Sequence, residues 1–274
     1  MYTKQQLEAY KKRIHYTGDL TVSKDTLDAL IYTHQCGIPY ENLDVCDFHR
    51  EILLDENSLF EKMVDRKRGG YCLEMNGFFC RILQSIGFDA RPCLCRVMFG
   101  VEDPGDNCID HRSTIVTLDG QRYLCDVGIG GAMPSKALPL TPENCWQELR
   151  GEYFCIKSIE RNWYGVFRRA SVSQDIQDDP MNRRERLEWI FCDAAAHEID
   201  FISVNYYLSQ SDESKFRHTR MANIRTQEGY RALTNRTYRE VIRGRRTERE
   251  LSYEEIPIVL REKFGIEVCE DLRF

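Results

Sequence analysis

The segment "HRSTIVTLDGQRYLCDVGIGG", residues 111–131, constrains the fold of this chain more than any other stretch. Apolar and polar side chains alternate on both sides of Asp119-Gly120, and Asp-Gly is a strong signal for a two-residue β-hairpin turn. With these two residues in the turn, Leu118 pairs with Gln121. The turn therefore sets which side chains face each other along both strands, and it predicts an antiparallel sheet in the middle of the chain.

The register of this hairpin brings three polar side chains together. Ser113 faces Asp126, and His111 lies on the same face as both because side chains alternate along a strand. His111 and Asp126 are then diagonal neighbours, about 7 to 8 Å apart at the backbone, and their side chains can span that gap in a hydrogen bond. Asp110 is a rival partner, but adjacent strand residues face opposite sides. We therefore expect Asp126 to orient His111 and to stabilise its charged form.

Helical patterns occupy the chain before this hairpin. Apolar residues recur at helical spacing in "TKQQLEAYKKRI", "SKDTLDALIYTHQCG" and "DENSLFEKMVDRKRGG". The third pattern has Asn57 or Ser58 as its candidate N-cap. It ends at Gly69-Gly70, and a further helix follows at once and stops at Gly87.

Strand patterns begin after residue 87. "FDARPCLCRVMFG", "EYFCIKSI" and "WYGVFRRA" indicate strands, residues 183–210 are helical or mixed, and "TNRTYREVIRGRRTERELS" indicates a strand pair. Ser252 opens an S-x-x-E capping box for a last helix. We predict an α+β fold of three units that pack together: a helical bundle (1–87), a β-rich unit (88–190) and a third unit (191–274).

The net charge bears on the partners of the protein. The 274 residues carry a net charge of −6 at pH 7, and a general nucleic-acid binder needs a positive field, so we expect no nucleic-acid partner. No apolar run reaches the roughly 18 to 20 residues of a membrane span, so we expect no membrane partner. The first residues show no apolar signal region, which favours a cytoplasmic location with reduced cysteines.

The stretch "RGGYCLEMNGFF" places a thiol where a glycine turn enters a helix. A helix N-terminus carries a partial positive charge that favours thiolate over thiol, and a nearby imidazolium adds to this effect. The glycines allow close approach of the backbone and leave N–H groups available to an oxyanion. These features make Cys72 a candidate nucleophile, with His111 as its base and Asp126 as the orienting carboxylate.

Other interpretations of the same residues are open at this point. Cys93, Cys95, Cys108 and His111 could together hold a zinc ion in a non-enzymatic binding module, although the chain has no C-x-x-C pair. The order Cys-His-Asp also fits a thiol hydrolase or a transglutaminase. Metal analysis separates the first alternative from an enzyme, because a zinc-bound His111 could not act as a base.

Several motifs resemble those of the arylamine N-acetyltransferases. "RGGYCLEMNGFF" is similar to their R-G-G-x-C-x-E-x-N motif, and "HQCGIPYENLDV" is similar to their H-x-x-x-I-P-F-E-N-L stretch. Residues 111–131 resemble their histidine strand and D-V-G-F-G-G loop. Residues 212–238 resemble a later region in which a Phe, an arginine-rich strand and an L-x-N segment follow in order. The resemblance covers nearly the whole chain.

This resemblance implies a fold, a catalytic triad and two substrates. The fold is a helical bundle, a β-barrel-like middle unit and an α/β lid around a cysteine-protease-like core. The triad is Cys72, His111 and Asp126, and no metal is expected. The donor is acetyl-CoA and the acceptor is an arylamine, arylhydroxylamine or hydrazine, in a ping-pong reaction through acetyl-cysteine. An alternative is acyl transfer or amide synthesis in natural-product assembly, which would use the same reactive residues.

Two of the positions that depart from the family motifs concern the expected substrate pocket. Tyr40 replaces the usual Phe, and Ile129 stands where the D-V-G-F-G-G loop has an aromatic residue that helps to line the acceptor pocket. Ile129 keeps that wall apolar but removes ring stacking. We expect Tyr40 and Ile129 to line the substrate pocket, and Gly130 and Gly131 to offer backbone N–H groups to the phosphates of CoA.

Overall fold

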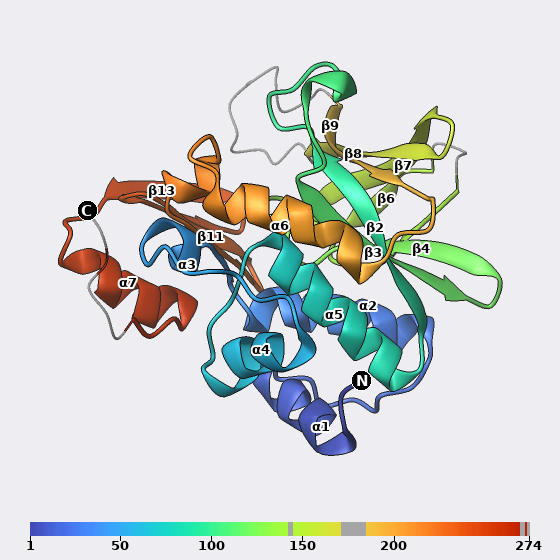
Figure 1. Ribbon diagram of the computed structural model, residues 1–274, viewed down its shortest axis with the longest axis horizontal. Helices are drawn as coiled ribbons and strands as arrows, with labels where there is room; N and C mark the ends of the chain where they lie inside the picture. The colour runs from blue at the N-terminus through green and yellow to red at the C-terminus, as the bar shows by residue number, and fades with distance from the viewer. Residues whose placement is uncertain (142–144, 171–184, 269–271, 273–274) are drawn as a thin grey trace.

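The computed structural model describes residues 1–141, 145–170, 185–268 and 272 (Figure 1). Helices make up most of the first part of the chain, as predicted. They are α1 (Lys4–Arg13), α2 (Lys24–Gly37), α3 (Leu43–Cys46), α4 (Glu56–Phe60), the π-helix η1 (Glu61–Asp65) and α5 (Cys72–Ile86). The apolar faces of all of them except α3 share one core, in which Tyr10, Leu27 and Phe78 are fully buried, whereas Leu43 of α3 packs with the C-terminal part of the chain.

The helix predicted over "DENSLFEKMVDRKRGG" has a different N-cap residue from the two that were predicted. The carboxylate of Asp55 accepts hydrogen bonds from the N–H groups of Asn57 and Ser58, at 3.1 and 3.0 Å. The prediction of Asn57 or Ser58 as the cap is therefore wrong, because both lie inside the first turn that Asp55 caps. The α-helix continues into the π-turn of η1 before it reaches the glycines.

The middle of the chain forms an antiparallel sheet of eight strands in the order β5-β4-β3-β2-β9-β8-β7-β6. The strands are β2 (Asp89–Val97), β3 (His111–Leu118), β4 (Gln121–Cys125), β5 (Leu138–Pro139), β6 (Gln147–Leu149), β7 (Glu152–Glu160), β8 (Trp163–Ala170) and β9 (Arg186–Cys192). The sheet curls around buried side chains that include Phe154, Trp189 and Phe191. This is the β-barrel-like unit that the family resemblance implies, and α5 packs against its strands β2 and β3 (Figure 1).

Strands β3 and β4 form the predicted hairpin. Asp119 and Gly120 have positive φ angles of 51° and 76°, as a type I′ turn requires. Leu118 pairs with Gln121, so the predicted register is confirmed. Asp126 follows directly after the last residue of β4.

A second sheet, of five strands, has the order β1-β10-β11-β12-β13. Its strands are β1 (Tyr40–Glu41), β10 (Met221–Thr226), β11 (Gly229–Thr234), β12 (Thr237–Ile242) and β13 (Arg245–Glu250). The helices of this part of the chain are α6 (Phe201–Gln210), α7 (Glu255–Phe264) and the short 3-10 helices η3 (Glu198–Asp200) and η4 (Lys215–Arg217), whereas η2 (Pro104–Asp106) lies in the middle unit. Because β1 belongs to the N-terminal region, the helical part and the C-terminal sheet are joined through backbone pairing. Helix α7 packs beside this sheet, and α6 crosses toward the barrel (Figure 1).

The third part contains the predicted strand pair as β12 and β13, but the predicted pattern did not include β10 and β11 and misplaces one cap. Residues 185–210 contain β9, η3 and α6, whereas residues 183 and 184 of the predicted mixed segment lie outside the described ranges. The N–H group of Ser252 donates to the Glu255 carboxylate at 2.8 Å, but α7 begins only at Glu255. The S-x-x-E pattern therefore identifies the helix and places its start too early. Within the described ranges, no helix has the length and apolar surface that crossing a bilayer requires.

Candidate active site

Two glycines bring the chain close to its neighbours just before Cys72. A Cβ atom on Gly69 would lie 1.8 Å from the carbonyl oxygen of Pro39, so a larger residue does not fit without moving the backbone. Gly70 forms a parallel bridge with Tyr40. Helix α5 then begins at Cys72, and its first N–H groups have no acceptor within the helix. The thiol is therefore placed beside backbone donors.

A buried network of five charged side chains holds this turn. Lys62 lies 2.6 Å from Asp44 and 2.7 Å from Glu74. Arg68 lies 2.8 Å from Glu41 and 3.3 Å from Asp44. All five side chains are buried. Removing one member of such a network would leave its partner charged and unpaired in the interior, so the network is sensitive to any displacement of the turn.

Glu74 connects this network to the start of α5. Its carboxylate accepts a hydrogen bond from the N–H group of Tyr71 at 3.0 Å while it also binds Lys62. A negative charge in the first turn of a helix is stabilised by the helix dipole, but burial raises the pKa of Glu74 to about 7 even though Lys62 opposes this shift. Cys72 is therefore held in place by the charge network, the glycine turn and the start of the helix.

Strand β3 and the residue after β4 bring His111 and Asp126 into direct contact, as the hairpin register predicts. Nε2 of His111 lies 2.6 Å from Oδ2 of Asp126, and both side chains are buried. The Ser113 hydroxyl donates to the same carboxylate oxygen. Burial opposes charge on the ring, but Asp126 and the nearby Cys72 hold the pKa of His111 well above its usual value. Burial also opposes charge on the carboxylate, yet His111 lowers the pKa of Asp126. The pair therefore favours imidazolium and carboxylate.

Asn76 is a residue of this site that the sequence analysis missed. Its Nδ2 donates to Oδ1 of Asp126 at 3.1 Å, and its Oδ1 accepts from the N–H group of Val127 at 3.0 Å. The N–H group of Gly128 donates to the same carboxylate oxygen at 2.9 Å. A signal for Asn76 is present in the motif R-G-G-x-C-x-E-x-N, because the asparagine stands one helical turn after Cys72 and shares its face of α5.

The Cys72 thiol reaches the same pair of residues. Its side chain is buried, and Sγ lies 3.6 Å from the carbonyl oxygen of Asp110. Nδ1 of His111, the ring nitrogen that Asp126 does not bind, is buried and has no hydrogen-bond partner in the described part of the chain. The rival carboxylate of Asp110 is used elsewhere and accepts from the backbone of Val97 at 2.8 Å. The structure thus brings together Cys72, His111 and Asp126.

Of the predicted substrate-binding residues, Tyr40 shares a buried cluster with Cys72, and Gly130 of the loop after β4 lies against the Tyr40 ring. Ile129 is buried with the apolar side chains of the barrel. Gly130 has a φ angle of 73°, and a Cβ atom there would lie 2.9 Å from the Tyr40 ring, so this contact requires glycine. Burial and the nearby Cys72 raise the pKa of Tyr40 well above its usual value. A Cβ atom on Gly131 would meet no atom closer than 3.6 Å, so space does not restrict that position.

The four candidate zinc ligands do not converge. The sulfur atoms of Cys93 and Cys95 are buried and 3.9 Å apart, whereas Cys108 is exposed and Nε2 of His111 binds Asp126. Among the residues that the structure describes, no three His, Cys, Asp or Glu side chains are arranged to hold a metal ion. This geometry gives the zinc-module alternative no support.

Comparisons with known proteins bear on the same site. The family model for N-acetyltransferases matches residues 23–273. The arylamine N-acetyltransferase / N-hydroxyarylamine O-acetyltransferase of Salmonella typhimurium is 30% identical over 267 residues, which cover 96% of this chain and 89% of that protein. The chain belongs to the arylamine N-acetyltransferase family. It is therefore an acyltransferase.

Solved structures of arylamine N-acetyltransferases have the same fold. That of the Salmonella typhimurium protein matches with a TM-score of 0.87 at 27% identity, over 98% of this chain and 94% of that chain. The arylamine N-acetyltransferase of Mycobacterium marinum in complex with CoA matches with a TM-score of 0.84 at 25% identity, over 95% and 92% of the two chains. The α+β fold that the sequence resemblance implies is thereby confirmed.

Proposed function

We propose that this arylamine N-acetyltransferase moves an acetyl group from acetyl-CoA to the nitrogen or oxygen of an arylamine, an arylhydroxylamine or a hydrazine. The acetyl group would travel as a thioester on Cys72. The observation that carries this proposal is the contact of His111 with Asp126, which leaves the second ring nitrogen available beside the thiol. A Mycobacterium marinum relative in complex with CoA supports CoA as the donor.

The first half reaction begins with the Cys72 proton on His111. The thiolate attacks the carbonyl carbon of acetyl-CoA and forms a new C–S bond, while N–H groups at the start of α5 stabilise the oxyanion. The bond between the carbonyl carbon and the sulfur of CoA then breaks. CoA leaves as a thiol with the proton from His111, and the neutral ring stays bound to Asp126.

The second half reaction transfers the acetyl group to the acceptor. The amine nitrogen attacks the acetyl carbon on Cys72, and neutral His111 takes a proton from that nitrogen. The C–S bond breaks, the acetylated amine leaves, and the pair of thiolate and imidazolium is restored. CoA departs before the amine reacts, so the kinetics are ping-pong.

The remaining predicted residues have binding roles in this proposal. Tyr40 and Ile129 form walls of the acceptor site. Gly130 and Gly131 turn backbone N–H groups toward the CoA phosphates. The nucleophile comes from the unit 1–87, the base and carboxylate come from 88–190, and the unit 191–274 covers the site.

The test is the intact mass of the protein after mixing with acetyl-CoA and no amine. We expect a gain of about 42 Da, one acetyl group, that is lost when an arylamine is added. Cys72→Ala should show no gain, and Cys108→Ala, which removes an exposed thiol, should gain the full mass. A gain that survives in Cys72→Ala would overturn the mechanism. A gain that appears only with other acyl thioesters would favour acyl transfer in natural-product assembly.

A further inference from the structure

The loop after β4, residues 126–137, carries Asp126 at its start and the proposed substrate residues Ile129, Gly130 and Gly131 further on. It connects β4 with β5 and has no helix or strand of its own. The backbone polar groups of such a segment need partners outside it, because the segment has no regular hydrogen-bond ladder. The contacts of the loop with its neighbours therefore decide where the walls of the proposed site lie.

Two glycines of this loop lie close against residues around the thiol. A Cβ atom on Gly128 would lie 2.6 Å from Cβ of Met75, and a Cβ atom on Gly130 would lie 2.9 Å from the ring of Tyr40. Met75 belongs to the same helix as Cys72, and Tyr40 shares a buried cluster with that residue. A small displacement of the loop would therefore change the shape of the site beside the thiol.

One side chain of the helical part ties two distant points of this loop together. Nε2 of Gln35, on α2, donates to the carbonyl oxygen of Asp126 at 3.0 Å and to that of Pro134 at 2.9 Å. A side-chain amide has two N–H donors, so both are used on the loop. Gln35 is buried, with 3% of its surface exposed, and solvent therefore has little access to either bond.

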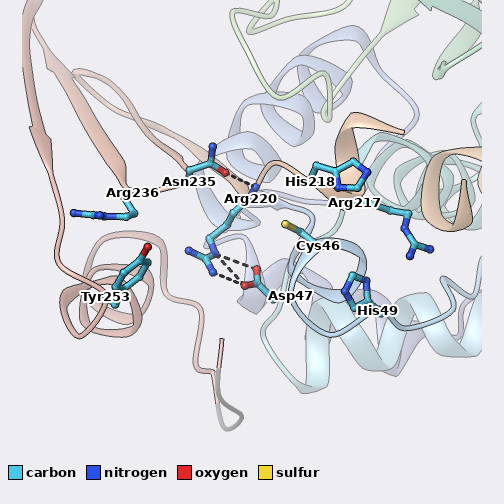
Figure 2. Close-up of a pocket in the computed structure, with 9 residues that line it drawn as sticks. All are labelled: Cys46, Asp47, His49, Arg217, His218, Arg220, Asn235, Arg236 and Tyr253. Atoms are coloured by element: carbon cyan, nitrogen blue, oxygen red, sulfur yellow. Dashed lines mark hydrogen bonds and ion pairs between the residues drawn. The ribbon is translucent and has the colours of Figure 1, made fainter. Parts of the chain in front are cut away.

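Strand β10 gives the later part of the loop a further support. Nη2 of Arg225 on this strand donates to the carbonyl oxygen of Met133 at 2.5 Å. Arg220, directly before β10, pairs with Asp47, and Figure 2 shows this pair in the wall of a cavity. The start of β10 is thereby fixed to the helical part. The later part of the loop is thus held from two sides, and Gln35 connects it with Asp126.

The amide of Gln35 also has an unfavourable side. Its Oε1 is buried and has no hydrogen-bond partner among the residues that the structure describes, and an unpaired buried acceptor destabilises a fold. A methionine of similar size would fill the same space without this penalty. What the amide adds is the pair of bonds to the loop, so these bonds, and not packing, distinguish Gln35 from an apolar residue.

We propose that Gln35 is a positioning residue for acetyl transfer, which holds the loop after β4 in the place where it binds both substrates. The inference rests on the proposed function, because it takes Ile129 as part of the acceptor wall and Gly130 and Gly131 as ligands of CoA. A loop that is in its binding position only part of the time lowers the apparent affinity by that fraction. It leaves the rate at saturation unchanged, because bound substrate selects the binding position.

Proton transfer should be little affected by the loss of Gln35. Gln35 binds the main-chain carbonyl of Asp126, whereas the carboxylate of Asp126 is held by Asn76 at 3.1 Å and contacts His111 at 2.6 Å. These two contacts remain when Gln35 is replaced. We therefore expect weaker binding of acetyl-CoA and of the amine, with a nearly normal rate at saturation.

The test is the replacement Gln35→Met, followed by the acetyl-enzyme mass in quenched time courses over a range of acetyl-CoA concentrations. These data separate the half-saturating concentration from the rate at saturation. We expect the half-saturating concentration to rise about tenfold, which corresponds to about one molecule in ten with the loop in its binding position. Gln35→Asn, whose shorter amide can keep one of the two bonds, should show the same change to a smaller degree, and it serves as the test if the methionine variant does not fold.

Gln84→Met is the matched control. Gln84 lies near the end of α5 that is remote from Cys72, and its Nε2 donates to the carbonyl oxygen of Ala90 at 2.9 Å. The control removes the same kind of bond and should leave the half-saturating concentration unchanged. Hydrogen exchange of the backbone amides of residues 127–137 is a second readout. It should be faster in Gln35→Met than in the wild type, and unchanged in Gln84→Met.

Three results would overturn the inference. One is an unchanged half-saturating concentration with unchanged hydrogen exchange in both Gln35 variants, while urea unfolding shows folded protein. A second is a loss confined to the rate at saturation, which would assign Gln35 to proton transfer through Asp126. The third is an equal change in Gln84→Met, which would indicate a general loss of stability. Absence of acetylation on Cys72 of the wild type would instead refute the proposed function, so the two failures are distinguishable.

Discussion

Replacing Asp126 by Asn tests the electrostatic part of the mechanism, because it removes a charge with little change in shape. The amide oxygen of the new side chain can still accept from Asn76 and Gly128, which bind Oδ1 in the native protein. The amide NH₂ then faces Nε2 of His111, where Oδ2 stood. It donates to that nitrogen and moves the ring proton to Nδ1, the nitrogen on the side of the thiol. The ring then cannot accept the proton of Cys72.

The size of the effect follows from the lost attraction between imidazolium and carboxylate. With Nε2 and Oδ2 2.6 Å apart, the two charge centres are about 4 Å apart, and such charges attract by about 4 kcal/mol at the effective dielectric of a protein site. A barrier higher by that amount slows a reaction about a thousandfold. We therefore expect acetylation of Cys72 in Asp126→Asn to be about a thousandfold slower than in the wild type.

The assay is a quenched time course of the acetyl-enzyme mass with saturating acetyl-CoA. Ser113→Ala is the control variant, because it removes a hydrogen bond to the same oxygen but keeps the charge. The loss of one hydrogen bond, about 1 kcal/mol, corresponds to about fivefold in rate. Urea unfolding of both variants checks the fold. Acetylation of Asp126→Asn within tenfold of the wild-type rate would refute the argument that the charge of Asp126 drives formation of the thiolate.

Three further expectations concern stability and acceptor choice. The raised pKa of His111 stabilises the fold at pH values below about 6.5, and this gain fades as the pH rises through the raised value. The lowered pKa of Asp126 keeps the stabilisation from its carboxylate present down to about pH 4. The melting temperature of Asp126→Asn should therefore lie further below that of the wild type at about pH 6 than at about pH 10. Equal differences in melting temperature at the two pH values would contradict this expectation. At about pH 9, where Glu74 with its pKa of about 7 is ionised, Glu74→Gln leaves a buried lysine with one charged partner fewer and should lower the free energy of unfolding by about 3 kcal/mol in urea titrations. Glu61 forms only an exposed ion pair, so Glu61→Gln should lower the free energy of unfolding by less than about 1 kcal/mol. Similar losses of stability in both variants would contradict a stabilising role of the buried network. Ile129→Phe should raise kcat/KM for two-ring over one-ring amines about fivefold through ring stacking, and an unchanged ratio would exclude Ile129 from the acceptor wall.

Local sequence rules were sufficient to predict the geometry of the half of the site that lies on the hairpin. Both central positions of a type I′ turn need a positive φ angle, which few amino-acid types adopt easily, and Asp119 and Gly120 are of such types. Once the turn is placed, strand alternation decides that His111 and Asp126 share a face. No tertiary information is needed for that conclusion, and the 2.6 Å contact agrees with it.

Other features of the structure depend on long-range packing, which local sequence rules do not predict. The contact between Cys72 and His111 depends on how α5 lies against the sheet, and no spacing in the sequence encodes that angle. The cap prediction failed for a related reason. Asp and Ser are both good N-cap residues whose capping free energies differ by only tenths of a kcal/mol, so the surrounding turn selects between Asp55 and Ser58. The two bonds of Gln35 to the loop after β4 likewise form only when α2 lies against that loop.

The candidate site therefore lies where two frameworks of the fold meet. The thiol belongs to the glycine turn with its buried charge network, and the imidazole belongs to the hairpin. Asn76 joins them, because it shares α5 with Cys72 and holds both the Asp126 carboxylate and the Val127 backbone. A displacement of α5 from the hairpin would break two buried hydrogen bonds and leave their partners unpaired, at a cost of about 1 to 3 kcal/mol each. In the proposed mechanism, the distance between the Cys72 thiol and the His111 ring therefore depends on the buried amide of Asn76, which has no chemical step of its own.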